Sequence, residues 1–414
     1  MGEQEKVEGA LSPYRVLDLT DEKGLLCGKL LGDLGADVIK VERPGGDPAR
    51  SQGPFYHDEV DPEKSLFWFA YNASKRGITL DIETADGQDI FNRLVKGADF
   101  MIESFDPGYL DKLGLGYSAL EKINPRLIMV SITPFGQTGP YKDYKAPDIV
   151  AWAMAGRMYS VGDADRPPVR ISYHSQAYLQ AGLEAAMGAM MALYYRRITG
   201  EGQQVDLSIQ AAAAQPSNTT WDIRKVVPQR GGQTTGNINV QRVWPCKDGL
   251  VTWFFMPGQF SARRNVAFVK WLDSEGMADD FLKEFDWDTF AYATITQEEM
   301  DRISEPAAKF FMAHTKVELL EGAVKYRILF YPQFTTTDIL ESAQLAARGF
   351  WVELEHPELD TTITYPGAFA QISETPLRIS RRAPLIGEHN QEVYQKELGI
   401  SSEELLTLEQ AKVI

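Results

Sequence analysis

The chain is 414 residues long, with 44% hydrophobic residues, 24% charged residues and a formal net charge of −16. Its length predicts two or three domains with sizeable cores. The net negative charge argues against nucleic acid as a partner, because binding to phosphates needs a basic face.

The composition predicts a cytoplasmic protein with no membrane partner. No stretch approaches the roughly 18 to 20 uncharged apolar residues that are needed to cross a bilayer. The acidic residues 1–10 do not resemble a signal peptide. The two widely separated cysteines, Cys27 and Cys246, are typical of buried thiols, and the five histidines are scattered, so we predict no metal site.

The first elements predict a parallel sheet. Residues 14–20 and 37–42 have the apolar character of buried strands, and residues 24–35 between them that of a helix. Such a unit places its two strands parallel. Its glycines lie inside the helix, which argues against the dinucleotide-binding fingerprint. A loop rich in glycine and proline, residues 43–48, follows the second strand, at the end where α/β proteins bind ligands.

The alternation of strands and helices continues to about residue 215. Further strands are predicted at residues 78–82, 99–103 and 127–132, and an amphipathic helix at residues 84–96. This pattern is typical of a doubly wound, Rossmann-like α/β domain.

The longest predicted helix lies within residues 170–197 and is rich in small residues. Gly182 and Gly188 stand in its interior, where glycine costs roughly 1 kcal/mol relative to alanine. We therefore expect another backbone or a ligand very close to this helix. Arg196 and Arg197 suit its negatively polarised C-terminal end.

The alternation of strands and helices ends about halfway along the chain, which predicts three parts. Residues 1–215 form the first part of a large domain, residues 216–350 a smaller α/β domain with linkers, and residues 351–414 a return to the large domain. Within the smaller domain, residues 243–255 predict a hairpin and residues 259–330 are mainly helical.

Several stretches together carry a family resemblance. In chain order they include VLDLT, LLGDLGADVIKVERPGGDPAR, KRGITLDIETADGQDIFNRLVKGADFMIESFDPG, RRITGEGQQVDLS and RAPLIGEHNQEV. As an ordered set, from near residue 14 to near residue 400, they resemble the class III CoA-transferase family, which includes formyl-CoA and carnitine CoA-transferases. The resemblance implies a Rossmann-like large domain, a smaller α/β domain and an interlocked dimer. It also implies acyl-CoA as a substrate and no covalently bound cofactor.

The family's reaction moves CoA from an acyl-CoA to a free carboxylate. An enzyme aspartate attacks the thioester and forms a mixed anhydride, and the CoA thiolate then attacks the aspartyl carbonyl to give an enzyme–CoA thioester. The acceptor acid repeats the cycle in reverse. This chemistry requires an ionised carboxylate in a site that is dry enough to protect anhydrides and thioesters from water.

The resemblance implies CoA contacts at five positions. Arg43 matches the arginine that holds the CoA nucleotide, and Leu80 and Phe105 match apolar residues that line the same site. Lys112 and Lys145 stand where the family has basic residues, which suit the phosphates of CoA. For each cation, the alternative is a solvated surface charge.

One further residue and one loop bear on the same site. Glu83 stands where a related enzyme has a CoA-contacting lysine, and a carboxylate there is expected to repel the phosphates. The sequence Gly231-Gly232-Gln233 resembles the mobile glycine-rich loop that covers the family's active site.

The nucleophile position departs from the family. The family's aspartate lies four residues before a glycine near the start of the long helix. Counting back without gaps from Thr199, that glycine is Gly182 and the nucleophile position is Tyr178. A phenol, with an ordinary pKa of about 10, cannot form the mixed anhydride. Asp148 matches another acidic position close to the family's site, and we expect it to orient the loop there. Because Pro147 and Tyr178 replace the acid/base pair of the racemase branch, we do not expect α-proton exchange.

We therefore expect a CoA-transferase chain that lacks its own nucleophile and acts with a homologous catalytic chain in an interlocked heterodimer. The two-subunit benzylsuccinate branch of the family, which serves anaerobic toluene degradation, is similar in this respect. That resemblance implies succinyl-CoA as the CoA donor. Two alternatives stay open: an active homodimer that uses Asp148 or an acid from a shifted helix register, and a scaffold that binds acyl-CoA without catalysis.

Overall fold

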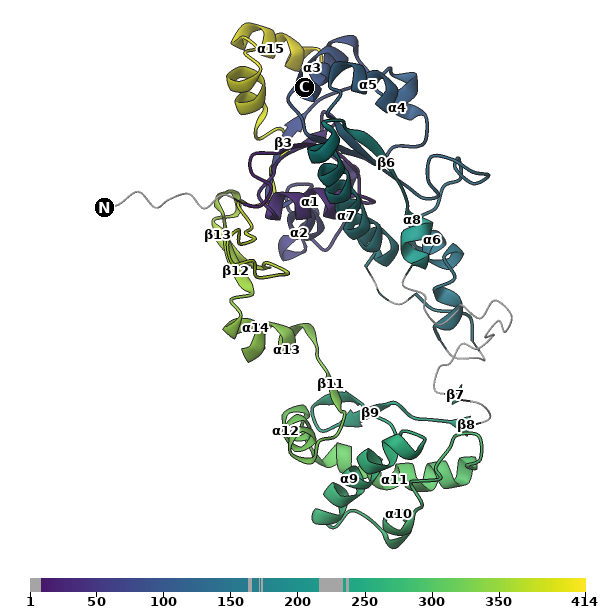
Figure 1. The fold of residues 1–414 in the computed structure, drawn as a ribbon. Coiled ribbons are helices and arrows are strands. Elements are labelled where there is room, and N and C mark those ends of the chain that lie inside the picture. Colours follow the sequence, from purple (N-terminus) through teal and green to yellow (C-terminus); the bar gives the residue numbers. More distant parts are fainter. Residues whose placement is uncertain (1–8, 163–165, 171, 173, 216–233, 236–237) are drawn as a thin grey trace. The chain divides into compact units, whose positions relative to one another are not determined.

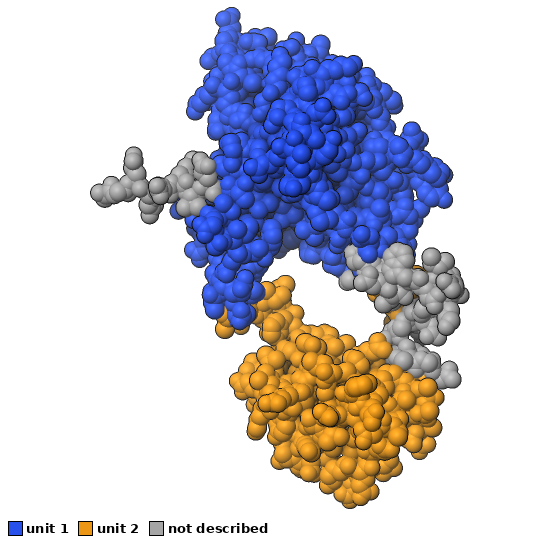
Figure 2. All heavy atoms as spheres, in the orientation of Figure 1, with its two compact units in different colours: residues 1–157, 171–223, 344–414 blue, residues 158–170, 224–343 orange. Residues whose placement is uncertain are grey.

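The computed structural model describes residues 9–162, 166–170, 172, 174–215, 234–235 and 238–414. The chain divides into two compact units (Figure 2): unit 1 comprises residues 1–157, 171–223 and 344–414, and unit 2 comprises residues 158–170 and 224–343. This division departs from the predicted parts chiefly at residues 158–170, which belong to unit 2.

Unit 1 is built on one six-stranded parallel sheet with the order β3-β2-β1-β4-β5-β6. Figure 1 labels its two edge strands, β3 and β6. Its strands are β1 (Arg15–Leu19), β2 (Asp37–Glu42), β3 (Lys75–Thr79), β4 (Phe100–Glu103), β5 (Ile128–Thr133) and β6 (Gln203–Ser208). All neighbouring pairs are parallel, which confirms the predicted Rossmann-like sheet. The order reverses between β1 and β4, and the carboxyl ends of strands at such a point are where α/β sheets bind ligands.

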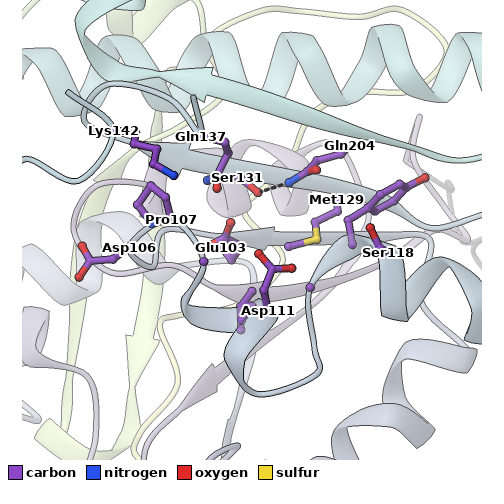
Figure 3. Close-up of a pocket in the computed structure, with 14 residues that line it drawn as sticks. Glu103, Asp106, Pro107, Asp111, Ser118, Met129, Ser131, Gln137, Lys142 and Gln204 are labelled. Carbon is purple, nitrogen blue, oxygen red and sulfur yellow. Dashed lines mark hydrogen bonds between the residues drawn. The ribbon is translucent and has the colours of Figure 1, made fainter. Parts of the chain in front are cut away.

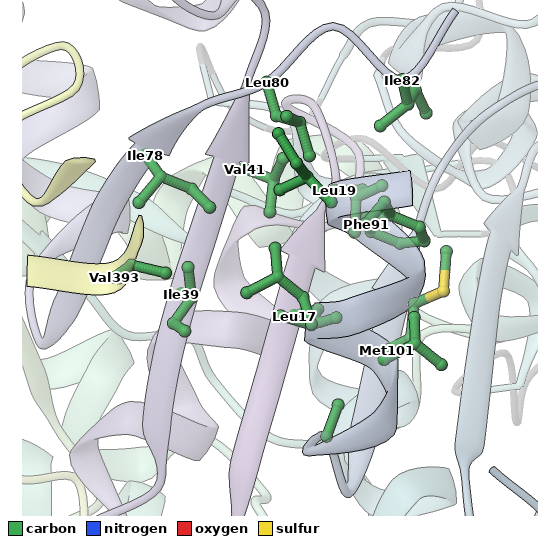
Figure 4. Close-up of a cluster of buried hydrophobic side chains, with 14 of the residues drawn as sticks. Leu17, Leu19, Ile39, Val41, Ile78, Leu80, Ile82, Phe91, Met101 and Val393 are labelled. Carbon is green, nitrogen blue, oxygen red and sulfur yellow. The ribbon is translucent and has the colours of Figure 1, made fainter. Parts of the chain in front are cut away.

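Helices pack on this sheet. In chain order they are α1 (Leu25–Asp33), α2 (Leu66–Asn72), α3 (Ala85–Lys96), α4 (Tyr109–Lys112), α5 (Tyr117–Ile123), α6 (Asp148–Met154), α7 (Gln176–Thr199), α8 (Ile209–Ala214), a π-helix (Gln391–Glu397) and α15 (Ser402–Gln410). One face is a hydrophobic core in which Leu17 and Ile39 of the strands meet Phe91 of α3 and Val393 of the π-helix (Figure 4). The C-terminal segment of the chain therefore contributes to the core of unit 1. A hairpin of β12 (Trp351–His356) and β13 (Thr361–Pro366) precedes it.

Strand β3 begins three residues earlier than predicted, at a buried lysine. The Nζ atom of Lys75 donates hydrogen bonds to Asp18 Oδ2 (2.8 Å), Asn72 Oδ1 (2.9 Å) and the carbonyl oxygen of Leu25 (2.9 Å). These partners satisfy a charge that would otherwise be too costly to bury. Periodicity in the sequence does not reveal them, so the strand was predicted to start at the apolar Ile78.

The small residues of α7 allow it to pack closely on α1 and β6. A Cβ atom added at Gly182 would lie 2.9 Å from Cβ of Leu26 on α1, and one added at Gly188 would lie 3.0 Å from Cγ1 of Val205 on β6. The expected close approach of another segment is thereby confirmed, and at Gly182 it includes backbone, since the added Cβ would lie 3.4 Å from the backbone nitrogen of Cys27. The helix ends at a left-handed Gly200 (φ 85°), and Arg196, buried at its C-terminal end, pairs with Asp99 at 2.9 Å.

Unit 2 combines a small antiparallel sheet with helices. Its sheet has the order β11-β10-β9, and the predicted hairpin is confirmed as β9 (Val243–Cys246) and β10 (Gly249–Thr252), with β11 (Tyr331–Gln333) beside it. Its helices are α9 (Gln259–Ser274), α10 (Asp280–Glu284), α11 (Gln297–Ala313), α12 (Lys316–Tyr326) and α13 (Thr336–Leu340). An aromatic core that includes Trp253, Phe268 and Phe311 holds these elements together. No helix within the described residues has both the length and the apolar character of a membrane span.

Candidate functional site

The loops that follow β2, β3 and β4 bring four predicted or neighbouring side chains together at the carboxyl edge of the sheet. Nη2 of Arg43, after β2, lies 3.2 Å from Oε1 of Glu83, after β3. The hydroxyl group of Tyr109, on α4, donates to the same carboxylate at 2.6 Å and lies 3.4 Å from Nη2 of Arg43. The ring of Phe105, after β4, stacks on Tyr109 with centroids 4.7 Å apart. A cation, a carboxylate and a two-ring platform thus share one exposed site.

Glu83 forms an ion pair with Arg43, so the two charges compensate each other. The expectation that this carboxylate disfavours the phosphates of CoA stays a prediction. Both side chains are more than half exposed, at 66% for Arg43 and 53% for Glu83. An anionic ligand that takes Arg43 must therefore compete with Glu83 for it. The contact with Tyr109 connects two loops that are far apart in sequence, which local patterns cannot reveal.

The other predicted CoA residues are distributed differently. Leu80 directly follows β3, and its side chain is buried in the core between the sheet and α3. Lys145 is exposed and forms an ion pair with Asp106, next to Phe105. Lys112 is exposed at the end of α4 and makes no ion pair within the described residues. Gly231, Gly232 and Gln233 lie outside the described residues.

Tyr178, at the predicted nucleophile position, lies in the first turn of α7 and is buried. Its hydroxyl group donates to the carbonyl oxygen of Ala146 at 3.2 Å. Burial raises the pKa of Tyr178, and the carboxylates of Glu22 and Asp148 raise it further. The phenol therefore stays protonated and cannot supply a nucleophilic oxygen at neutral pH.

Asp148 holds the start of α7 in place. Its Oδ1 atom accepts hydrogen bonds from the backbone N–H groups of Ala177 (2.8 Å) and Tyr178 (3.2 Å). A carboxylate suits this position, because the first N–H groups of a helix lack internal partners and carry positive polarity. The geometry agrees with an orienting role for Asp148.

The immediate surroundings of Tyr178 are mostly apolar. A small pocket is lined by Glu22, Leu25, Leu26, Phe67, Tyr71, Ser175, Tyr178 and Leu179. Its one carboxylate belongs to Glu22, in the loop between β1 and α1. Among these lining residues, none is an acid on α7, the helix on which the resemblance predicts an aspartate.

A polar cavity with a buried acid lies beside the Phe105 loop (Figure 3), and sequence reasoning missed it. Glu103, the last residue of β4, lines the cavity, and its Oε2 accepts the backbone N–H of Phe105 at 2.8 Å. Burial raises the pKa of Glu103 to about 7, against the lowering effect of hydrogen bonds from Ser131 and Phe105. An acidic residue that ends an otherwise apolar strand was the available signal. The described residues contain no cluster of acidic, histidine or cysteine side chains that could hold a metal ion.

Comparisons of the sequence and of the structure with known proteins all find CoA-transferase or CAIB/BAIF family proteins. The model of CoA-transferase family III matches residues 11–390. The chain is 36% identical over 386 residues to the succinyl-CoA:(R)-benzylsuccinate CoA-transferase subunit BbsE of Thauera aromatica, covering 92% of this chain and 93% of that protein. It is 31% identical to the succinyl-CoA–D-citramalate CoA-transferase of Chloroflexus aurantiacus, covering 98% of each. The crystal structure of a CAIB/BAIF family protein from Brucella suis superposes with a TM-score of 0.80 at 29% identity, covering 94% of this chain and 99% of that one.

Proposed function

Because this chain belongs to CoA-transferase family III, we propose that it is the non-catalytic subunit of a heteromeric CoA-transferase whose partner, a homologous chain, supplies the nucleophilic aspartate. The observation that carries the proposal is the buried phenol of Tyr178, which stands where counting along the helix predicts that aspartate. A phenol that is buried, bonded to a backbone carbonyl and held protonated cannot form an acyl anhydride.

The leading alternative nucleophile, Asp148, is poorly suited to attack a thioester. Its side chain is buried, and one of its oxygens already accepts two backbone hydrogen bonds. Such bonds stabilise the carboxylate and reduce its nucleophilicity. Acylation would also remove the charge that stabilises the start of α7.

The proposed substrates follow from the relatives. The two curated relatives described above carry succinyl-CoA in their names, and one of them is a subunit of a benzylsuccinate CoA-transferase. We therefore assign succinyl-CoA as the donor and a dicarboxylic acid such as benzylsuccinate as the acceptor. Within this chain, Arg43, Phe105 and Lys145 would contact CoA, with Glu83 weakening the contact by competing for Arg43.

An exposed apolar row on α7 supports a protein partner in an interlocked pair. Its side chains are between 48% and 69% exposed and belong to Leu183, Met187, Met191, Tyr194 and Ile198. Their spacing of three or four residues puts them on one face of the helix. Continuous apolar surface of this kind marks interaction sites in soluble proteins. The matching surface of a homologous subunit is the occupant we propose.

The decisive experiment compares the chain alone with the chain co-expressed with a paralogue that carries the aspartate four residues before the helix glycine. Incubation with succinyl-CoA should give a covalent aspartyl–CoA adduct, detected by mass spectrometry, only on the paralogue, and CoA transfer only by the pair. An adduct on this chain, or turnover by this chain alone, would refute the proposal. If CoA binds but neither chain transfers it, the scaffold alternative holds.

The partner surface can be tested separately. Met187→Glu combined with Met191→Glu should abolish co-purification with the paralogue, because two carboxylates would be buried in an apolar contact. Lys96→Glu, an exposed change at the end of α3, is the matched control and should leave the pair intact. Co-purification that survives the double substitution would place the partner elsewhere.

A further inference from the structure

The carboxylate of Glu83 has one oxygen that is engaged and one that is free. Both side-chain contacts use Oε1, which lies 3.2 Å from Nη2 of Arg43 and accepts the hydroxyl group of Tyr109 at 2.6 Å. The other oxygen, Oε2, takes part in no hydrogen bond or ion pair within the described part of the chain. More than half of the side chain is exposed, so a ligand can reach this carboxylate.

Tyr109 joins the carboxylate to an aromatic surface. Burial raises the pKa of Tyr109, and the hydrogen bond with Glu83 raises it further, so the phenol keeps its proton and donates it to the carboxylate. The rings of Phe105 and Tyr109 stack at an interplanar angle of 26°, and both are partly exposed. Nucleotide bases stack on aromatic faces of this kind. A hydrogen-bond acceptor thus lies beside a surface on which a base can stack.

The cations beside this surface have little charge to offer to a phosphate group. Arg43 is paired with Glu83, and Lys145 is paired with Asp106, so these two pairs carry no net charge. Lys112, the third cation that the resemblance assigns to CoA, forms no hydrogen bond or ion pair with either pair within the described residues. An added phosphate would therefore meet the free oxygen of Glu83 without an unpaired arginine to offset it.

A ribose hydroxyl group and a phosphate group interact with a carboxylate in opposite ways. An ionised carboxylate only accepts hydrogen bonds, so it binds a hydroxyl donor and repels a phosphate. Dinucleotide-binding folds use this difference, since an acidic residue there holds a ribose hydroxyl and an arginine accommodates a phosphate in its place. CoA carries a phosphate group on its ribose, whereas dephospho-CoA has a free hydroxyl group at that position and is otherwise identical.

We propose that Glu83 makes the nucleotide site of this chain selective for an adenine nucleotide with an unphosphorylated ribose, such as the nucleotide part of dephospho-CoA. A ribose hydroxyl group donates to Oε2 of Glu83, the base stacks on the rings of Phe105 and Tyr109, and Arg43 keeps its ion pair. This inference rests on the proposed function, because it takes the site as the nucleotide site of a CoA-transferase subunit.

The test measures the binding of dephospho-CoA and of CoA to the full-length chain by isothermal titration calorimetry. Dephospho-CoA should bind about tenfold more tightly, because CoA replaces a hydrogen bond to a carboxylate by a repulsion between charges. A higher salt concentration should reduce this preference, since salt screens exposed charges. Glu83→Gln removes the charge and should reduce the preference to less than about twofold. Glu83→Lys introduces a cation and should reverse the preference in favour of CoA.

A matched control separates Glu83 from the general negative charge of the chain. Glu298→Gln, which removes an exposed carboxylate of α11, should keep the wild-type preference. The inference is overturned if the wild type binds CoA at least as tightly as dephospho-CoA, if the preference survives Glu83→Gln, or if neither ligand binds. These outcomes differ from the failure of the proposed function, which would appear as a covalent adduct on this chain or as turnover by this chain alone.

Discussion

A carboxylate oxygen of Asp148 lies 3.2 Å from the backbone nitrogen of Tyr178 and accepts its hydrogen bond. Because Ala177 donates to the same oxygen, Asp148 acts as a remote cap for α7. Asp148→Ala should lower the free energy of unfolding by about 1 to 2 kcal/mol, the usual cost of a lost N-terminal cap, as measured by urea denaturation. Asp148→Asn keeps an acceptor oxygen and should cost less.

The variant Asp148→Asn also tests whether Asp148 is the catalytic nucleophile. In the complex with the catalytic partner, Asp148→Asn should retain most CoA transfer, since only the charge at the helix start is lost. If Asp148 were the nucleophile, the amide would abolish transfer while leaving the fold intact.

Tyr178 is expected to act through packing. Tyr178→Phe removes only the hydrogen bond to Ala146 and should lower the free energy of unfolding by no more than about 1.5 kcal/mol. CoA transfer by the complex should change less than about twofold, because the protonated phenol contributes no chemistry. Tyr178→Ala, by contrast, should cost about 3 to 5 kcal/mol through the cavity that it leaves. A loss of transfer in Tyr178→Phe at unchanged stability would assign the hydroxyl group a catalytic role.

The ion pair of Arg43 with Glu83 should set the affinity for CoA. Glu83→Gln frees Arg43 and should tighten CoA binding, and Arg43→Gln should weaken it by about tenfold, because a charge-assisted contact with phosphate is lost. Isothermal titration calorimetry at two salt concentrations measures both effects, and Arg264→Gln serves as the control for a general change in charge. Weaker binding in Glu83→Gln would mean that the carboxylate positions Arg43 for CoA instead of competing for it.

Glu103 should make stability depend on pH. Its pKa is raised to about 7 in the folded protein, against an ordinary value of 4.5, so the folded state binds more protons between these values. The free energy of unfolding should therefore fall as pH rises from about 4.5 to about 7, and the contribution of Glu103 should level off above that. The full effect is on the order of 3 kcal/mol.

Urea denaturation of the wild type and Glu103→Gln across this range isolates the effect. The amide cannot ionise, so the difference in unfolding free energy between the two proteins should move steadily in favour of Glu103→Gln as pH rises. A difference that is constant with pH would show that folding does not raise the pKa of Glu103, and a difference that moves the other way would show that folding lowers it.

Much of unit 1 could be predicted from local patterns. The alternation of apolar strands and amphipathic helices marks the parallel sheet, and the glycines of α7 marked its close packing, since Gly182 meets α1 and Gly188 meets β6. The assignment of Tyr178 to the nucleophile position stays a prediction, which depends only on counting along one helix. These features depend on residues close together in sequence, where periodicity and propensity act.

What the tertiary structure alone decided involves partners that are distant in the chain. The start of β3 depends on Asp18, which lies 57 residues from Lys75, and the state of Arg43 depends on Glu83, 40 residues away. The raised pKa of Glu103 comes from its burial in the folded chain. The fold decides which charged groups can be buried, which form ion pairs and which have shifted pKa values. The reason is that electrostatic and desolvation energies depend on distance in space and not on position in the sequence.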